Sequence, residues 1–357
     1  MLAALAVAAP AKAQRTDHVL WRAADDGFAS WALAGVERSG SGELRLAAGR
    51  RSGDAIAPVT PTGVRFTEAI PSWNASTPRG TWLEVALRAR VGSRWTRWWS
   101  LGVWSSTDAR RRHSVGGQRD ASGRVATDTL ALARRGDAVQ LRLRLRSSGA
   151  ARPSVRLAAV AVSAPTGPAP RPASGRATLL DVPEYSQMVY RDGGEVWCSP
   201  TSLAMVLAYW HGYRGRPAPR VRRTVAGVYD PVYRGHGNWP FNTAFAATEG
   251  LEATVARLAD LREVEDWVAA GVPVIVSFGW KAGELSGAGG SSDGHLAVVV
   301  GFEADGDPIV NDPAARTNAA VRRAYPRRIF ERLWRLRSNG TAYLVHPPGR
   351  AVPPLAR

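Results

Sequence analysis

A proline-rich segment near the middle of the chain places the strongest constraint on the fold. The stretch from Ala164 to Arg176 leaves no room for a regular helix or strand, because it contains Pro165, Gly167, Pro168, Pro170, Pro172 and Gly175. Prolines at this density favour a semi-stiff extended linker. A chain of 357 residues is also longer than one hydrophobic core usually serves. We therefore predict a domain at residues 14–163, a linker at 164–177 and a second domain at 178–357.

The first domain has the alternating pattern of β-strands. Residues 140–146 place Leu141, Leu143 and Leu145 on one face and polar or basic side chains on the other. Residues 83–88 alternate in the same way, and glycine- and serine-rich clusters separate such runs. A period of two puts one face in a core and the other in water. Several short strands of this kind indicate an antiparallel β-sandwich-like accessory domain.

The positive charge of the chain is concentrated in this first domain. The net charge is +17, and residues 14–165 contain 24 arginines against 12 acidic residues. A basic surface of this kind attracts anionic polymers of a cell envelope, which we expect as a partner of the domain. Nucleic acid is not expected, because no nucleic-acid-binding signature accompanies the charge.

Residues 1–13 have the pattern of a secretory signal peptide that lacks its positively charged leading segment. Met1 to Ala9 is apolar, and Ala11-Lys12-Ala13 forms a small-x-small cleavage site. The alternative interpretation is a frayed N-terminus. No apolar run is long enough to cross a bilayer. We therefore expect an exported protein, extracellular or in the cell envelope, without a membrane span.

The second domain mixes helical and extended patterns. Helices are predicted over Pro200–Trp210, Asn242–Glu249 and Leu261–Ala270 from the spacing of apolar residues. Compact apolar strands are predicted at residues 274–278, 296–300, 309–310 and 343–345. One leading helix followed by a run of strands predicts an α+β arrangement.

Cys198 is the only cysteine of the chain. A lone cysteine is often an inert buried residue, so this interpretation has to be weighed against a catalytic one. Cys198 stands at the start of the predicted Pro200–Trp210 helix, where unpaired N–H groups and the positive end of the helix dipole favour the thiolate. This position is typical of a nucleophile.

A thiolate nucleophile needs a base, and His295 is the best placed of the six histidines. It follows Gly294 and leads directly into a buried apolar strand. Asp312 comes 17 residues later, after the next predicted strand, and would orient the imidazole. Asn311 is the alternative for that role, and we favour Asp312 because a carboxylate also stabilises the imidazolium.

Two further polar residues are candidates for the same site. Gln187 lies 11 residues before Cys198 and is either a donor to the oxyanion, together with the Cys198 backbone N–H, or a polar loop residue. His236 stands on a glycine-bearing loop, where it has either a structural role or a contact with substrate. The sequence predicts neither a metal nor another cofactor, since metal-ligand spacings are missing.

The motifs of the second domain resemble a known family. VPEYSQ, WCSPTSLAMVLAYW, GNWPFN, GHLAVVVGF and VNDPAA are similar in order, spacing and identity to the double-glycine-peptidase-like group of papain-fold cysteine peptidases. The resemblance covers about half the chain, from Leu180 to Tyr343. It implies a papain-like fold with Cys198 as nucleophile, His295 as base, Asp312 as third member and Gln187 as oxyanion donor.

The chain also departs from the best-known members of that family. Those members are leader-cleaving domains fused to membrane and ATP-binding parts, whereas no phosphate-loop motif is present here. The chain resembles the free-standing secreted bacterial branch. Trp197 stands where many relatives have glycine, so double-glycine specificity is not implied.

These observations predict a secreted cysteine peptidase that acts on a peptide or protein, with cell-wall peptides as one candidate substrate. Two alternatives stay open. One is a non-catalytic envelope-binding protein on a degenerate peptidase fold, and the other is an amidase or transpeptidase that transfers the acyl group. The sequence predicts no oligomeric state.

Overall fold

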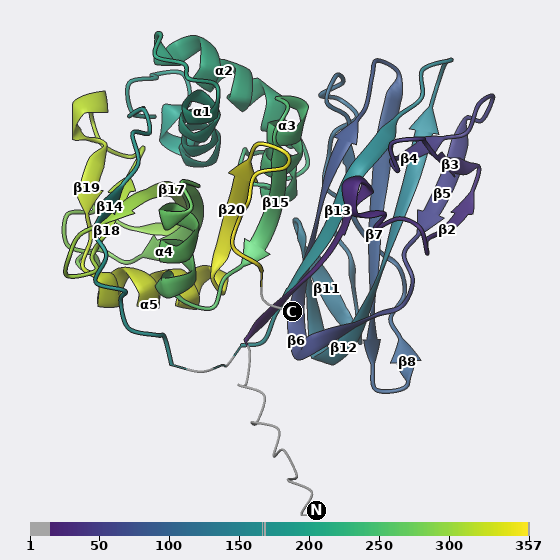
Figure 1. Cartoon of the computed structure of the whole chain (residues 1–357), viewed down its shortest axis with the longest axis horizontal. Helices are drawn as coiled ribbons and strands as arrows, with labels where there is room; N and C mark the ends of the chain where they lie inside the picture. Colours follow the sequence, from purple (N-terminus) through teal and green to yellow (C-terminus); the bar gives the residue numbers. More distant parts are fainter. Residues whose placement is uncertain (1–14, 166, 168, 356–357) are drawn as a thin grey trace, which may run out of the picture.

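The computed structural model describes residues 15–165, 167 and 169–355, and two lobes follow each other along the chain (Figure 1). The predicted signal peptide at residues 1–13 and two positions of the predicted linker, 166 and 168, lie outside the described residues. The first lobe is built from strands, and the second combines strands with helices. In the described part of the chain, none of the helices has the length and apolar character that a bilayer crossing needs.

The N-terminal lobe confirms the prediction of a strand-rich domain. Its strands form one hydrogen-bonded sheet of 13 strands that bends on itself. They are β1 (Thr16–Arg22), β2 (Ala32–Ala34), β3 (Val36–Arg38), β4 (Leu44–Leu46), β5 (Ser52–Ile56), β6 (Thr60–Ser76), β7 (Thr81–Val91), β8 (Arg94–Trp95), β9 (Trp99–Trp104), β10 (Arg119–Asp120), β11 (Gly123–Ala126), β12 (Thr129–Ser147) and β13 (Ser154–Ser163).

The long strand β12 connects the two parts of this sheet. Its first half pairs with β11 and β6, whereas its second half pairs with β7 and β5. In that second half Leu141, Leu143 and Leu145 are fully buried, as the alternation predicts. The arginines between them lie outward, and Arg144 and Arg146 form ion pairs with carboxylates of neighbouring strands. The outer face of these strands is therefore less basic than its sequence suggests.

The C-terminal lobe contains a seven-stranded sheet and five α-helices within the described residues. The sheet order is β15-β20-β16-β17-β18-β19, and β14 pairs with β17. The strands are β14 (Thr178–Leu179), β15 (Glu252–Arg257), β16 (Val274–Trp280), β17 (Ser292–Phe302), β18 (Pro308–Asn311), β19 (Arg322–Ala324) and β20 (Thr341–His346). The helices are α1 (Cys198–Trp210), α2 (Pro217–Val228), α3 (Trp239–Thr248), α4 (Leu261–Ala269) and α5 (Arg327–Ser338).

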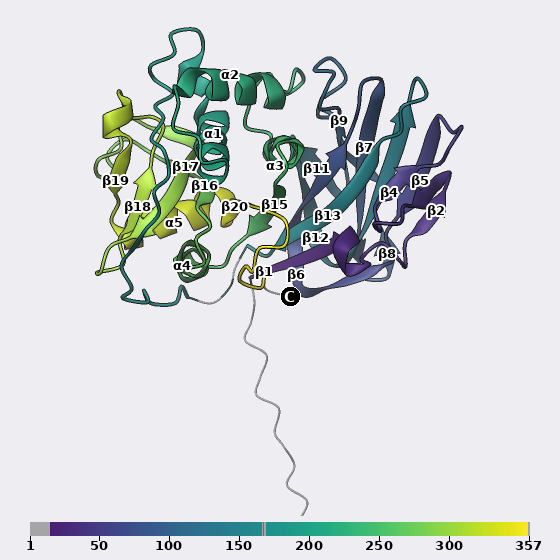
Figure 2. The same cartoon turned by 45° about the horizontal axis from the view of Figure 1, so that its top comes forward.

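The helices cover both faces of this sheet (Figure 2). Leu296, Val298 and Val300 of β17 pack in the same core cluster as α1, α2 and α3. Ala297 and Val299 of the same strand pack in the cluster that contains α4 and α5. Both faces of this strand are buried after His295, so its side chains there are apolar, which explains the unbroken apolar run.

The predicted helices and strands of this lobe are present, with shifted ends. The helix predicted from Pro200 begins two residues earlier, at Cys198, and the one predicted from Asn242 begins at Trp239. Helices α2 and α5 and strand β15 were not predicted. In α5 the signal was available, because Phe330, Leu333 and Trp334 recur at helical spacing and are buried.

The two lobes share an extensive interface. Strand β15 is the edge of the C-terminal sheet, and the N-terminal lobe covers it. Asn74 of β6 forms two hydrogen bonds with the backbone of Ala253, donating to its carbonyl (2.6 Å) and accepting from its N–H (3.0 Å). Phe241 of α3 inserts between Trp73 and Trp104. One cluster of buried apolar side chains therefore runs through both lobes.

The described part of the proline-rich segment has no regular structure, as expected, but it does not run free of the lobes. Arg171 forms an ion pair with Asp260 at 2.8 Å, and the Ser174 N–H donates to Glu265. Asp260 is the N-cap residue of α4, and Glu265 lies in the middle of that helix. The segment is thus attached to the surface of the C-terminal lobe.

Candidate active site

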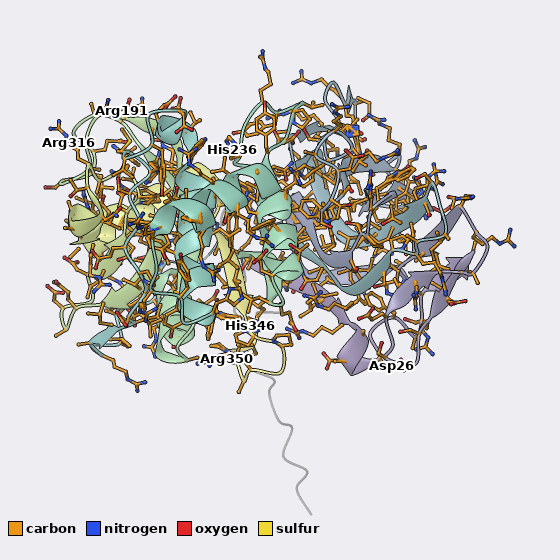
Figure 3. All side chains as sticks on the ribbon, turned by 90° about the horizontal axis from the view of Figure 1, so that it is seen from above. Asp26, Arg191, His236, Arg316, His346 and Arg350 are labelled. Atoms are coloured by element: carbon orange, nitrogen blue, oxygen red, sulfur yellow. The ribbon has the colours of Figure 1, made fainter. Side chains whose placement is uncertain are left out.

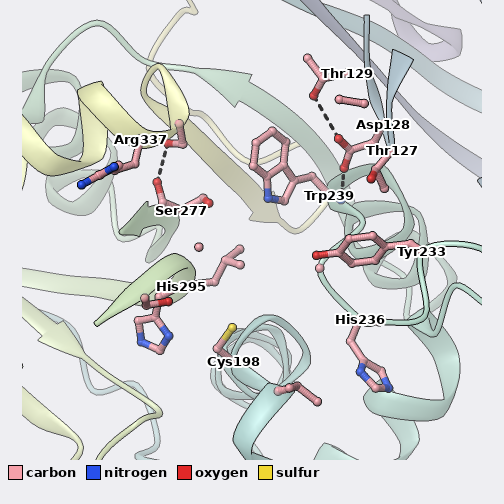
Figure 4. Close-up of a pocket in the computed structure, with 18 of the residues that line it drawn as sticks. Thr127, Asp128, Thr129, Cys198, Tyr233, His236, Trp239, Ser277, His295 and Arg337 are labelled. Atoms are coloured by element: carbon pink, nitrogen blue, oxygen red, sulfur yellow. Dashed lines mark hydrogen bonds between the residues drawn. The ribbon is translucent and has the colours of Figure 1, made fainter. Parts of the chain in front are cut away.

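Cys198 is the first residue of α1, and its side chain borders a cavity of about 740 Å³ (Figure 4). The preceding turn, Gly194–Val196, directs the chain into the helix. The helix behind Cys198 is buried from Ser199 to Ala208, whereas Cys198 itself is partly exposed. The helix therefore presents its N-terminal thiol to the cavity and uses the rest of its length for packing.

His295 faces the cavity from β17, opposite the start of α1 (Figure 4). In the strand register it lies beside Phe278 of β16. The rings of Phe278 and Trp280 pack against the imidazole, each with a centroid distance of 5.4 Å and nearly perpendicular planes. These contacts hold the ring in one orientation.

Asp312 accepts a hydrogen bond of 2.8 Å from His295 Nε2. The carboxylate follows directly after β18, the strand that pairs with β17. It also accepts hydrogen bonds from the Ala314 backbone N–H (2.9 Å) and the Tyr325 hydroxyl (2.6 Å). Because Nε2 binds Asp312, Nδ1 is the nitrogen left for Cys198.

Asn311 does not contact His295 in this arrangement. Its side-chain amide donates to the carbonyls of Val182 and Pro183 and accepts from Arg322. The structure thus brings Asp312, and not the alternative Asn311, to the imidazole.

The electrostatics of the three residues favour a charged thiol–imidazole pair. Burial alone would raise the pKa of Cys198, but the hydrogen bond and charge of His295 and the backbone N–H groups of Leu296 and Ser199 lower it below its ordinary value. Burial alone would lower the pKa of His295, but Asp312 and Cys198 raise it to about 10. Burial opposes ionisation of Asp312 as well, yet His295 and Tyr325 hold the pKa of that carboxyl well below its usual range.

Two hydrogen bonds tie the start of α1 to the sheet. The Ser202 hydroxyl, one turn after Cys198, donates to the carbonyl of Leu296 at 3.0 Å. Ser199 and the buried Tyr343 of β20 share a hydrogen bond of 3.0 Å. Since Leu296 follows His295 directly, the first of these bonds links the positions of the thiol and the imidazole.

Gln187 lines the same cavity and is almost fully buried. Its Nε2 donates to the carbonyl of Gly194 at 2.7 Å, which leaves the second N–H of the amide available. Glycine at position 194 lets the two backbone segments lie close together, because a Cβ there would lie 2.1 Å from the backbone carbonyl oxygen of Gln187. As the first residue of α1, Cys198 has a backbone N–H without an acceptor inside the helix. The role of both groups as oxyanion donors stays a prediction.

His236 lies toward the boundary between the lobes and lines the cavity (Figures 3 and 4). Its ring contacts Trp197 and Tyr229, and burial and the charge of Arg112 lower its pKa to about 4. A neutral imidazole packed between aromatic rings forms part of the cavity wall and does not act as an acid or base. In the described residues no cluster of three or more histidine, cysteine or carboxylate side chains could hold a metal ion.

Sequence reasoning missed several residues around the site. Tyr325 comes 13 residues after Asp312, across β19, and no local motif connects them. Phe278 and Trp280 lie on β16, which was predicted as residues 274–278. The prediction did not say which strand pairs with it, so the contact with His295 was not foreseen. The sequence also gave no sign that the N-terminal lobe reaches the cavity, because such a contact depends on how the two lobes pack.

Comparisons with known proteins cover both lobes. Residues 179–342 match a sequence model described as the Peptidase_C39 like family, and residues 19–163 match one described as the Peptidase C39 N-terminal domain. Among solved structures, a Bacillus anthracis protein described as a C39-like peptidase is 19% identical, with a TM-score of 0.35 over 48% of this chain and 97% of that one. No curated protein matches the chain significantly.

Proposed function

Because the chain belongs to the C39-like peptidase family, we propose that it is a cysteine peptidase that hydrolyses peptide bonds through Cys198, His295 and Asp312. The C-terminal lobe then has a papain-like α+β fold, in which the helix that carries the nucleophile packs on the antiparallel sheet that carries the other two residues. The observation that carries the proposal is the continuous chain of contacts from the helix N-terminus through the imidazole to the buried carboxylate.

In the acylation step the Cys198 sulfur attacks the carbonyl carbon of the scissile peptide bond. The negative charge moves to the carbonyl oxygen, where the Cys198 backbone N–H and Gln187 Nε2 are the candidate donors. Protonated His295 gives its Nδ1 proton to the leaving amine as the C–N bond breaks. The product is a thioester on Cys198 and a free amine.

In the deacylation step neutral His295 removes a proton from water, and the resulting hydroxide attacks the thioester carbon. The C–S bond breaks and releases a carboxylic acid and the thiolate, which recovers its ion pair with His295. Asp312 stays ionised throughout, fixes the ring and stabilises the imidazolium in both steps.

Alkylation with iodoacetamide tests the proposal directly, because Cys198 is the only thiol in the chain and each adduct reports on it. We expect fast labelling near neutral pH in the wild type and a rate lower by about 10²-fold or more in His295→Ala, since the imidazole lowers the thiol pKa. His211→Ala is the matched control, because His211 contacts Glu249 at the far end of α1. Labelling of the wild type at the rate of a free thiol would contradict the proposal.

Incubation with a mixture of peptides and cell-wall fragments, followed by mass spectrometry, identifies the bond that is cut. Cys198→Ala should abolish each new product. Incorporation of ¹⁸O from labelled water would show hydrolysis, whereas products joined to a second amine would show acyl transfer. Wall binding by Cys198→Ala with no hydrolysis by the wild type would favour the non-catalytic alternative.

We also propose export and attraction to anionic envelope polymers. Both rest on the sequence: export on residues 1–13, and attraction on the arginine surplus of the N-terminal lobe. Binding of the purified protein to an anionic wall polymer at low and high salt tests the second, because such attraction weakens as salt increases.

A further inference from the structure

The cavity at Cys198 has two walls that come from different lobes (Figure 4). One wall belongs to the C-terminal lobe and carries Cys198 and His295. The other is formed by residues of β6, β11, β12 and the turn between the last two. In Figure 4 the labelled turn residues Thr127 and Asp128 and the first residue of β12, Thr129, lie across the cavity from Cys198. A substrate bound at Cys198 therefore has part of the N-terminal lobe opposite it.

The strand register shows which side chains form the surface of this second wall. Arg124 pairs with Ala131, Ala126 pairs with Thr129, and Ala131 pairs with Glu68 of β6. Directly paired residues lie on the same face of a sheet, so these five side chains form one continuous surface, which we call the hairpin wall. Its central members are small. They leave space across the cavity from the nucleophile that larger side chains would fill.

The hairpin wall is anchored to the C-terminal lobe. Asp128 in the turn accepts a hydrogen bond of 2.7 Å from the backbone N–H of Trp239, the first residue of α3, and another from the Thr129 hydroxyl. At the other end of the wall, Glu68 pairs with the buried Arg257 of β15 at 2.8 Å. Both ends of the wall are thus fixed relative to the elements that carry the active site.

Charged side chains of both signs line this cavity. Arg257 is neutralised by Glu68, and Arg337 forms an ion pair with Glu284. Four other charged residues line the cavity without an ion pair among the described residues: Arg124, Arg234, Glu195 and Asp128. Arg124 belongs to the hairpin wall, and Arg234 belongs to the loop before α3. Two positive and two negative groups balance, so this wall discriminates by the space it leaves rather than by the charge of the substrate.

We propose that the hairpin wall is a substrate-binding surface that accommodates extended peptides across the cavity from Cys198. The proposal rests on the peptidase function of Cys198 proposed above. It gives the N-terminal lobe a direct part in specificity, in addition to any attraction to the cell envelope. It also predicts that small amides reach Cys198 without using this surface.

Thiol probes of two sizes test the proposal. Iodoacetamide is small, whereas N-iodoacetyl-Ala-Ala-Ala amide extends from the sulfur along the cavity. In both reactions the thiolate displaces iodide, so one S–C bond forms and one C–I bond breaks. Ala126→Trp, at an exposed position of the wall, should slow the peptide probe by about tenfold or more and leave iodoacetamide within about twofold. Ala133→Trp, exposed on the neighbouring strand β12 but outside the cavity, should change neither rate.

A second variant, Ala131→Trp, should show the same size selectivity as Ala126→Trp. Equal slowing of both probes in the two variants, or no slowing of either, would overturn the proposal.

The size test remains readable if the proposed catalytic function fails. At about pH 9.5 an ordinary thiol is largely ionised without help from a histidine. The ratio of the two rates at that pH depends on the space beside Cys198 and not on activation by His295. A slow wild type near neutral pH would thus contradict the peptidase proposal, while the ratio at high pH would still decide the role of the wall.

Discussion

The Tyr325 hydroxyl donates a hydrogen bond of 2.6 Å to Asp312 Oδ2, the carboxylate oxygen that does not face His295. Burial and the Asp312 charge raise the pKa of Tyr325, so the phenol remains a donor across the working pH range. The hydrogen bond gives the second oxygen of the buried Asp312 carboxylate a donor, since His295 and the Ala314 N–H both donate to the first oxygen. It extends the line of catalytic contacts by one residue that the sequence motifs do not include.

Removal of this donor should weaken the site without unfolding the protein. Tyr325→Phe keeps the ring but loses the hydrogen bond to a charged group, a loss of about 1.5–3 kcal/mol. The Asp312 pKa should rise and the His295 pKa should fall, so we expect kcat/KM to drop by about tenfold or more. Hydrolysis of a peptide found in the mixture experiment measures the drop. Tyr209→Phe, which loses a hydroxyl contact to Gly271 away from the cavity, is the control.

The charge of Asp312 should matter more than its shape. Asp312→Asn preserves the outline of the side chain but loses the negative charge that stabilises the imidazolium, and we expect the hydrolysis rate to fall by about 10²- to 10⁴-fold. Asn311→Ala should instead lower the melting temperature, because the carbonyls of Val182 and Pro183 lose a donor. Its iodoacetamide rate should depend on pH as in the wild type. The reverse result would assign the orienting role to Asn311.

Hydrolysis and alkylation should respond differently to high pH. Alkylation should increase as Cys198 ionises, at a pH below that of an ordinary thiol, because the Cys198 pKa is lowered. Hydrolysis should increase over the same range and decrease again near pH 10, since His295 with a pKa of about 10 then loses the proton that the leaving amine needs. Alkylation needs only the thiolate and should not decrease there. A common decrease of both rates would show that the protein unfolds at high pH.

The parts of the site that the sequence predicts are those set by local structure. Cys198 at a helix start, His295 at the mouth of a buried strand and Asp312 after the next strand are each readable from a few neighbouring residues. Tyr325 and the hairpin wall depend on contacts between distant segments, and periodicity contains no information about such contacts. For the same reason, the burial of Leu141, Leu143 and Leu145 was predicted correctly from local alternation. The ion pairs of the arginines between them were not predicted, because their partners lie on other strands.

The same distinction between local patterns and contacts of distant segments applies to the fold. Helices α1 and α4 were predicted because their apolar spacing is regular. Strand β15 was missed because its sequence, Glu-Ala-Thr-Val-Ala-Arg, is short and partly polar, and its burial comes from the N-terminal lobe. Asn74, Ser72 and His18 of that lobe contact the backbone of Ala253 and Val255. Side chains of one lobe thus complete the edge strand of the other.

This arrangement predicts that the C-terminal lobe depends on the N-terminal lobe. An uncovered edge strand presents unpaired N–H and C=O groups and promotes association between copies. In residues 178–357 expressed alone, β15 would have such an edge, and Phe241 would lose its contacts with Trp73 and Trp104. We expect this fragment to aggregate or to form oligomers, measured by size-exclusion chromatography with light scattering, whereas the full chain should not show association through β15. A monomeric, folded fragment would show that the edge needs no cover.

A point substitution tests the same dependence in the full chain. Asn74→Ala removes both hydrogen bonds to Ala253 and leaves a buried backbone donor and acceptor without partners, at a cost of about 1–3 kcal/mol for each group. The melting temperature should fall by several degrees, since each kcal/mol shifts it by about 2–4 °C in a large domain. Asn74→Asp should be at least as destabilising, because it also places a charge in a fully buried position beside the Ala253 carbonyl oxygen. If instead Asn74→Ala melts with the wild type, the backbone of β15 finds water or another partner, and apolar packing alone holds the two lobes together.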